Sequence, residues 1–142
     1  APLYAYEFTG YWKDVGTLSS YWEANMELID IVPEFNLYEE YWKIYTKSEI
    51  QPPDYIAGDS VVERSIIGEG SDIYGEVYNS VIGCGVTIGK GTVIRDSIIM
   101  NQTQIGEECE INKAIIASGV TAAADYEDSQ LASGKTLIKA GE

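Results

Sequence analysis

The chain of 142 residues has no histidine and only two cysteines. Without imidazole it can supply neither a histidine general base nor a histidine-bound zinc ion. The two cysteines, Cys84 and Cys109, form no metal motif and no disulfide framework, which favours a reducing cytoplasm. Apolar runs are short of the roughly 18 residues that a membrane span requires, and no secretory signal is visible, so we expect no membrane.

Basic residues are scarce: 9 Lys and Arg stand against 23 Asp and Glu, giving a net charge of −14. The charge is evenly divided, since residues 1–55 carry 10 acids and 3 bases and the remainder carries 13 and 6. A nucleic-acid partner requires a basic surface, so we expect no nucleic acid. The chain opens with Ala1 and not with Met, and we expect a piece of something longer or a processed protein.

The chain does contain a repeat. A six-residue motif of the form aliphatic–x–x–Ser/Ala–aliphatic–aliphatic recurs at Val62–Ile67, Val77–Ile82, Ile94–Ile99 and Ile111–Ile116. Its starts are 15, 17 and 17 residues apart, and a period this short is typical of a solenoid. The shorter first step predicts a shortened side between Ile73 and Val77, as a kink or a loop.

Within the repeat, aliphatic residues recur at steps of four to six: Ile56, Val62, Ile67, Ile73, Val77, Ile82, Ile88, Ile94, Ile99, Ile105, Ile111 and Ile116. Small or β-branched residues fill the fifth position of each hexad: Ser60, Ser71, Val86, Thr92, Thr103, Cys109 and Val120. Neither the helical period nor simple alternation gives this pattern. It predicts a mainly β protein, a parallel β-helix over residues 56–121 in which three hexads form one triangular coil and both residue types point inward.

Residues 1–32 carry a different pattern and predict a strand-loop-helix arm. Leu3–Phe8 alternates loosely and is aromatic, which predicts a strand. A glycine-flanked loop follows, and from Leu18 the apolar spacing predicts one helix of about three turns that ends before Pro33. Thr17 is a candidate N-cap, with a capping box at Ser20–Glu23 as the alternative.

Two further segments are expected to be irregular: a connector at 33–55 and a C-terminal tail at 122–142, which departs from the hexad pattern. The aromatic side chains of the first 55 residues would form an exposed apolar patch if left alone. We expect them to pack on the β-helix, on a missing domain or on another subunit.

Asp14 is the candidate for chemistry, because it lies in a loop between the predicted strand and helix, and such loops commonly carry function. A lone carboxylate there could bind Mg²⁺ together with substrate phosphates. The alternative is a turn-stabilising aspartate, which the residues alone favour. Gly89–Thr92 resembles a phosphate-binding loop only faintly, and the hexad pattern explains it.

The motif Tyr6–Thr17, with its core Trp-Lys-Asp-Val-Gly-Thr, resembles glucose-1-phosphate adenylyltransferase (ADP-glucose pyrophosphorylase). The segments Leu18–Leu28, Asn36–Tyr38 and Trp42–Thr46 continue the match, which runs from residue 3 to about 120. That family joins an N-terminal nucleotidyltransferase domain to a C-terminal left-handed β-helix. The resemblance therefore implies a left-handed solenoid and makes residues 1–32 the end of the nucleotidyltransferase domain.

The resemblance also implies a function. The family transfers an adenylyl group from ATP to glucose 1-phosphate, giving ADP-glucose and pyrophosphate for glycogen biosynthesis. By the match, Asp14 corresponds to a catalytic aspartate that binds Mg²⁺, and Trp12 to a residue lining the sugar-phosphate site, which reverses the preference for a turn role. The β-helix is then expected to serve assembly into a homo-oligomer, a tetramer, and allosteric control by phosphorylated metabolites.

The match is partial. The glycine-rich nucleotide loop, the second metal carboxylate and the basic phosphate-binding residues of the family are absent from these residues. The chain therefore looks like the C-terminal portion of such an enzyme, which would bind ATP and glucose 1-phosphate through the missing N-terminal domain, and is not expected to catalyse alone. A non-catalytic regulatory or assembly subunit is the alternative, and a hexapeptide acyltransferase is disfavoured by the lack of histidine.

Overall fold

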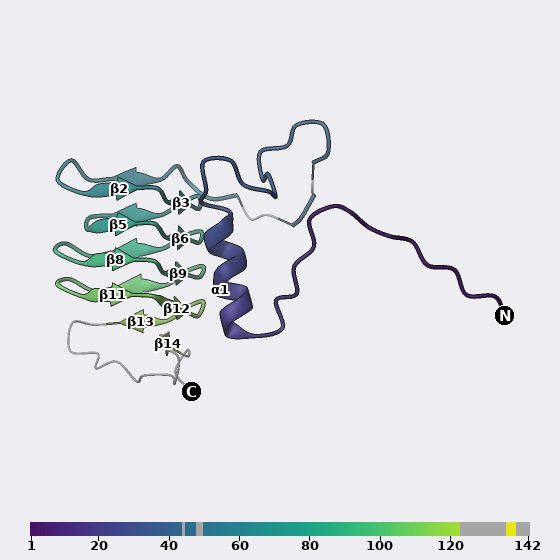
Figure 1. The fold of residues 1–142 in the computed structure, drawn as a ribbon. Helices are drawn as coiled ribbons and strands as arrows, with labels where there is room; N and C mark the ends of the chain where they lie inside the picture. Colours follow the sequence, from purple (N-terminus) through teal and green to yellow (C-terminus); the bar gives the residue numbers. More distant parts are fainter. Residues whose placement is uncertain (44, 48–49, 123–135, 139–142) are drawn as a thin grey trace.

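The structure is a computed structural model that describes residues 1–43, 45–47, 50–122 and 136–138. It is a parallel β-solenoid with one helix, α1 (Leu18–Glu27), lying alongside (Figure 1). The strands are β1 (Tyr55–Ile56), β2 (Val61–Glu63), β3 (Ile66–Ile67), β4 (Asp72–Ile73), β5 (Glu76–Tyr78), β6 (Val81–Ile82), β7 (Thr87–Ile88), β8 (Val93–Arg95), β9 (Ile98–Ile99), β10 (Gln104–Ile105), β11 (Glu110–Asn112), β12 (Ala114–Ile116), β13 (Thr121–Ala122) and β14 (Thr136–Ile138).

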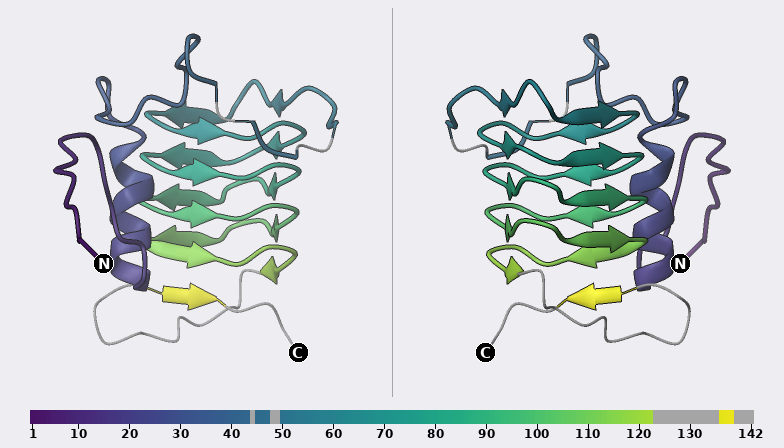
Figure 2. Two further views of the ribbon diagram at one scale, coloured as in Figure 1. Left: turned by 90° about the vertical axis from the view of Figure 1, so that its right-hand side faces the viewer. Right: turned by 90° about the vertical axis from the view of Figure 1, so that its left-hand side faces the viewer.

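Successive strands belong to three different sheets, so each coil has three sides. The sheet orders are β1-β4-β7-β10-β13, β11-β8-β5-β2 and β14-β12-β9-β6-β3, and neighbouring strands pair in parallel. Equivalent hexad positions face one another, as in Ile73 opposite Ile88 and Ile88 opposite Ile105. Figure 2 shows the resulting stack of coils. The mainly β, parallel solenoid predicted from the hexads is confirmed, and its handedness stays a prediction.

The core is a set of inward aliphatic columns, one from each side of the solenoid. Nine of the predicted residues are buried: Ile73, Ile88, Ile105, Val77, Ile94, Ile111, Ile82, Ile99 and Ile116. In the first coil, Val62 and Ile67 are half-buried, and Ile56 is 51% exposed. A coil buries its neighbours by stacking on them, so this first coil, with no described coil before it, is covered on one side only.

Buried hydroxyls explain why small polar residues stand at the corners. Ser80 Oγ accepts a hydrogen bond of 3.1 Å from the backbone N–H of Ser97, one coil further on, and Ser97 Oγ accepts one of 3.1 Å from Ala114. Thr92 Oγ1 likewise accepts a hydrogen bond of 3.0 Å from the N–H of the buried Cys109. Within the described residues no buried side-chain nitrogen or oxygen lacks a partner. The hydroxyls therefore link successive coils without a desolvation penalty.

The shortened side predicted between Ile73 and Val77 is a tight corner. Only two residues, Tyr74 and Gly75, separate β4 from β5, and the sheet continues in register through Glu76. A Cβ atom on Gly75 would lie 2.3 Å from the carbonyl oxygen of Thr92. Glycine allows this close approach of backbones, so the repeat loses two residues without a kink in the sheet.

The strand predicted for Leu3–Phe8 is wrong. Residues 3–8 form no strand, no described segment pairs with them, and Leu3 is 98% exposed. In Figure 1 this part of the chain, which begins at the N label, extends away from the solenoid. A strand needs a neighbour to complete its backbone hydrogen bonds, and alternation alone does not supply one.

The tail predicted to be irregular contains a strand. Thr136–Ile138 form β14, parallel to β12, with Ile115 opposite Leu137. The rest of that prediction, residues 123–135 and 139–142, lies outside the described residues. The described part of the connector contains no helix and no strand before β1 begins at Tyr55.

The substitution Gly75→Ala should lower the free energy of unfolding by about 1–3 kcal/mol, because the new methyl group meets backbone that cannot move aside. Gly58→Ala is the matched control: its Cβ has nothing within 4 Å, so little change is expected. Urea denaturation followed by circular dichroism measures both. Equal stabilities of the two variants would contradict the crowded-corner argument.

Candidate functional site

Helix α1 packs on the solenoid, and this packing positions the loop before the helix that carries Trp12 and Asp14. In each aliphatic doublet the second residue points inward, so the first points out of the sheet. On the sheet of β3, β6, β9 and β12, the outward residues are Ile66, Val81, Ile98 and Ile115. Ile98 and Ile115 are nevertheless only 2% and 3% exposed. Figures 1 and 2 show α1 along this side of the stack, which explains their burial.

Trp22 fixes α1 against one corner of the solenoid. Its indole Nε1–H donates a hydrogen bond of 2.7 Å to the backbone carbonyl of Asp96. The Lys113 ammonium lies 5.5 Å from the centroid of the Trp22 ring, within range of a cation–π contact. Asp96 and Lys113 stand at the same corner of successive coils, with φ of 48° and 53°. One side chain of α1 therefore contacts two coils.

The first residues of α1 connect the helix to the preceding loop. Ser20 N–H donates to Thr17 Oγ1 at 3.1 Å, and Thr17 N–H donates to Ser20 Oγ at 3.1 Å. This reciprocal pair is a capping box, which satisfies two backbone donors at once. The prediction of Thr17 as N-cap is confirmed, whereas the alternative box at Ser20–Glu23 does not form.

The last turn of α1 contacts the same loop, because Glu27 accepts two hydrogen bonds from it. Lys13 Nζ lies 2.5 Å from Glu27 Oε1, and the Tyr11 hydroxyl donates to Oε2 at 3.0 Å. The Tyr11 ring also stacks on Phe35, with centroids 5.6 Å apart. The bond from Lys13 holds the pKa of Glu27 below its ordinary value and raises that of Lys13. Desolvation, then the bond to Glu27, raises the pKa of Tyr11.

Trp12 and Asp14, the residues predicted to form the site, lie on this loop. The Trp12 side chain is 76% exposed, and Asp14 is exposed as well. Asp14 Oδ1 accepts a hydrogen bond of 2.9 Å from the N–H of Gly16, which is the turn-stabilising contact weighed as the alternative. No group of three possible metal-binding side chains occurs among the residues that the structure describes. The metal and substrate roles of these two residues stay predictions.

Sequence reasoning missed Tyr11, Lys13 and Glu27. Their contacts span 14 and 16 residues, so local spacing carries no signal for them. The sequence did carry a signal for the outward aliphatic ladder, which is the row Ile66, Val81, Ile98 and Ile115. Each repeat ends in two aliphatic residues, and the inward column accounts for only the second of them.

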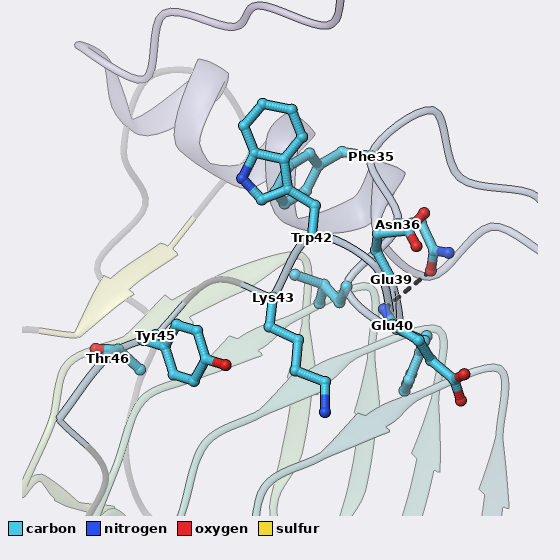
Figure 3. Close-up of a pocket in the computed structure, with 10 residues that line it drawn as sticks. Phe35, Asn36, Glu39, Glu40, Trp42, Lys43, Tyr45 and Thr46 are labelled. Carbon is cyan, nitrogen blue, oxygen red and sulfur yellow. Dashed lines mark hydrogen bonds between the residues drawn. The ribbon is translucent and has the colours of Figure 1, made fainter.

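The connector contains a hollow of about 660 Å³. Its lining includes Phe35, Trp42 and Tyr45 with both acidic and basic residues, and the side chains point in different directions rather than toward a common centre (Figure 3). A binding pocket needs a few convergent polar groups, so this hollow is not the candidate site. No helix in the described part of the chain is long and apolar enough to cross a membrane.

The repeated coils and their hexads define a hexapeptide-repeat protein. Residues 54–127 match the family model for a GlmU-like, C-terminal hexapeptide, and residues 1–31 match the model for a nucleotidyl transferase. The chain belongs to the GlmU-like, C-terminal hexapeptide family, with part of a nucleotidyl transferase sequence before the solenoid.

Relatives confirm the resemblance seen in the motifs. The glucose-1-phosphate adenylyltransferase of Lachnospira eligens is 71% identical over 86 residues, which are 61% of this chain and 20% of that protein. The enzyme of the same name from Acetivibrio thermocellus is 50% identical over 118 residues, 83% of this chain and 28% of the relative. That of Thermotoga maritima is 56% identical over 93 residues, 66% of this chain and 22% of the relative. The chain thus spans between a fifth and a third of these relatives.

The Lys13–Glu27 contact has a defined pH window. The pKa of Glu27 lies below its ordinary value of 4.5, so the contact is complete above about that pH and is lost as the pH falls through the lowered pKa. The pKa of Lys13 is raised above 10.5, so the contact persists to that pH and is lost as the pH rises through the raised value.

An NMR titration of the Glu27 carboxyl carbon should therefore give a midpoint below 4.5, and Lys13→Met should move it upward. Lys90→Met is the control, since Lys90 pairs with Asp59 on the solenoid and should leave the midpoint unchanged. A Glu27 midpoint that ignores Lys13→Met would contradict the contact.

Proposed function

We propose that this chain is the C-terminal portion of a glucose-1-phosphate adenylyltransferase. The enzyme would transfer an adenylyl group from ATP to glucose 1-phosphate, forming ADP-glucose and pyrophosphate in glycogen biosynthesis. The observation that carries the proposal is the order of the two family matches, a nucleotidyl transferase at 1–31 followed by hexapeptide repeats at 54–127, together with relatives of that name at up to 71% identity.

Within this proposal, the loop before α1 belongs to the substrate site. The exposed indole of Trp12 is free to pack against the sugar of glucose 1-phosphate, since apolar ring faces and aromatic side chains pack well. Asp14 is accessible, and it uses Oδ1 on the N–H of Gly16. Both side chains come from one short loop, so a sugar and its phosphate are within reach of the pair.

Asp14 fits a Mg²⁺ site of the kind expected for two phosphorylated substrates. Mg²⁺ keeps several waters and is commonly bound through one or two carboxylates and substrate phosphates, so one accessible carboxylate is compatible with it. Bound Mg²⁺ would offset the negative charge of the phosphates. The other ligands are expected from the larger part of the relatives that this chain does not cover, and this chain alone is expected to be inactive.

The solenoid is proposed to serve assembly and control, in a cytoplasmic homotetramer that responds to phosphorylated metabolites. The connector that leads into the solenoid supports an assembly role, because three of its large side chains are exposed to water: Tyr41, Trp42 and Tyr45. Such apolar surface is typical of interfaces with another domain or subunit.

A second candidate is a non-catalytic regulatory or assembly subunit with the same solenoid. The hydrogen bond from Gly16 N–H to Asp14 favours it, because a purely structural aspartate would make this contact. The two candidates differ in whether the full-length protein forms ADP-glucose, and the enzyme candidate alone requires the charge of Asp14.

The test is Asp14→Asn in the full-length protein. Asparagine keeps an oxygen that can accept a hydrogen bond from Gly16 N–H but loses the negative charge, so the turn survives while the anionic metal ligand is lost. We expect kcat/KM for ADP-glucose synthesis to fall by about 100-fold or more, with thermal stability unchanged.

Asp30→Asn, just beyond α1 and paired at 3.5 Å with Arg64, is the matched control and should keep full activity. Near-normal turnover of Asp14→Asn at saturating Mg²⁺ would rule out the metal role of Asp14. A full-length wild-type protein that forms no ADP-glucose would instead favour the non-catalytic subunit.

A further inference from the structure

The loop Tyr11–Asp14 presents its side chains alternately. Tyr11 and Lys13 are half-buried and turn toward α1, whereas Trp12 and Asp14 are exposed. Successive side chains of an extended stretch point to opposite sides, and the alternation of half-buried and exposed residues over 11–14 fits that geometry. The two candidate substrate residues thus share one face because their neighbours share the other.

One carboxylate secures both anchors. Glu27 uses Oε1 for Lys13 and Oε2 for Tyr11, at 2.5 Å and 3.0 Å. Glu23 also lies near Lys13 Nζ, but its 3.9 Å exceeds a hydrogen-bond distance. Glu27 is therefore the residue on which the orientation of the loop depends most directly.

The anchor is carried by a rigid element. Glu27 lies on the last turn of α1, and Thr17, three residues after Asp14, caps the first turn. The chain therefore runs back along the helix and is attached to it at both ends. Trp22 lies between these two ends of the helix and donates a hydrogen bond to the solenoid. The position of the loop is therefore fixed relative to the solenoid. Positioning of this kind contributes to catalysis when it reduces the freedom of substrate-binding groups.

We propose that Glu27 is a positioning residue of the adenylyltransferase site. It holds Tyr11 and Lys13 on α1, so that Trp12 and Asp14 together face the sugar phosphate and its Mg²⁺. This inference rests on the proposed function. Glu27 itself touches neither substrate nor metal in this role, and it acts through the two loop residues that it binds.

The experiment compares Glu27→Gln with wild type in the full-length protein. We expect the KM for glucose 1-phosphate and the Mg²⁺ concentration for half-maximal activity to rise about tenfold, while kcat at saturation changes by less than about twofold. Calorimetric titration of glucose 1-phosphate with Mg²⁺ and without ATP should show the same loss, as a Kd about tenfold higher. A purely structural role would instead lower the melting temperature or kcat and leave KM and Kd unchanged.

Two further variants sharpen the comparison. Glu23→Gln, one turn earlier on α1, is the matched control and should behave as wild type. The charge exchange Lys13→Glu with Glu27→Lys should restore the KM that Glu27→Gln raises. A failure of the exchange to restore it would assign Lys13 to direct phosphate contact and overturn the positioning role.

The outcomes separate the two proposals. If the wild-type protein makes ADP-glucose and Glu27→Gln leaves KM, the Mg²⁺ requirement and Kd unchanged, the positioning role is overturned and the proposed function stands. If the wild-type protein forms no ADP-glucose from ATP and glucose 1-phosphate, the proposed function fails, and the role of Glu27 fails with it.

Discussion

Coil-to-coil stacking is the constraint on which the rest of the structure depends. Each strand pairs with its equivalent one coil away, so a residue type at one position is repeated as a column along the solenoid. Inward columns form the core, and corner hydroxyls such as Ser97 connect the coils. The same repetition produces an outward ladder that includes Ile98 and Ile115 on one side, and α1 lies there. The place of the candidate loop thus follows from the stacking.

The hexads predicted the inward columns because their burial depends only on the repeat itself. The outward ladder was not predicted, although its residues form the first half of each aliphatic doublet. Its burial depends on a helix that is distant in the sequence. The strand at Leu3–Phe8 failed for a related reason. Its alternation is a local signal, whereas a strand exists only with a hydrogen-bonding neighbour, and none of the described residues provides one.

The candidate site shows the same division. The motif around Trp12 and Asp14 was recognised from sequence, and Thr17 was identified as a cap because capping depends on residues three apart. The role of Glu27 was hidden, since on the helix it looks like one more solvated acid. Only the return of the loop along α1 brings Tyr11 and Lys13 to it. Sequence therefore shows which loop residues are unusual, and the fold shows how they are oriented.

α1 contacts the solenoid and the loop through interactions of different kinds. Against the solenoid it covers a buried apolar ladder, and Trp22 adds a hydrogen bond worth about 1 kcal/mol. Against the loop it uses a partly exposed ion pair and a tyrosine hydroxyl, which water and salt weaken. Since salt does not screen apolar burial, the loop should loosen from α1 under conditions in which α1 stays on the solenoid.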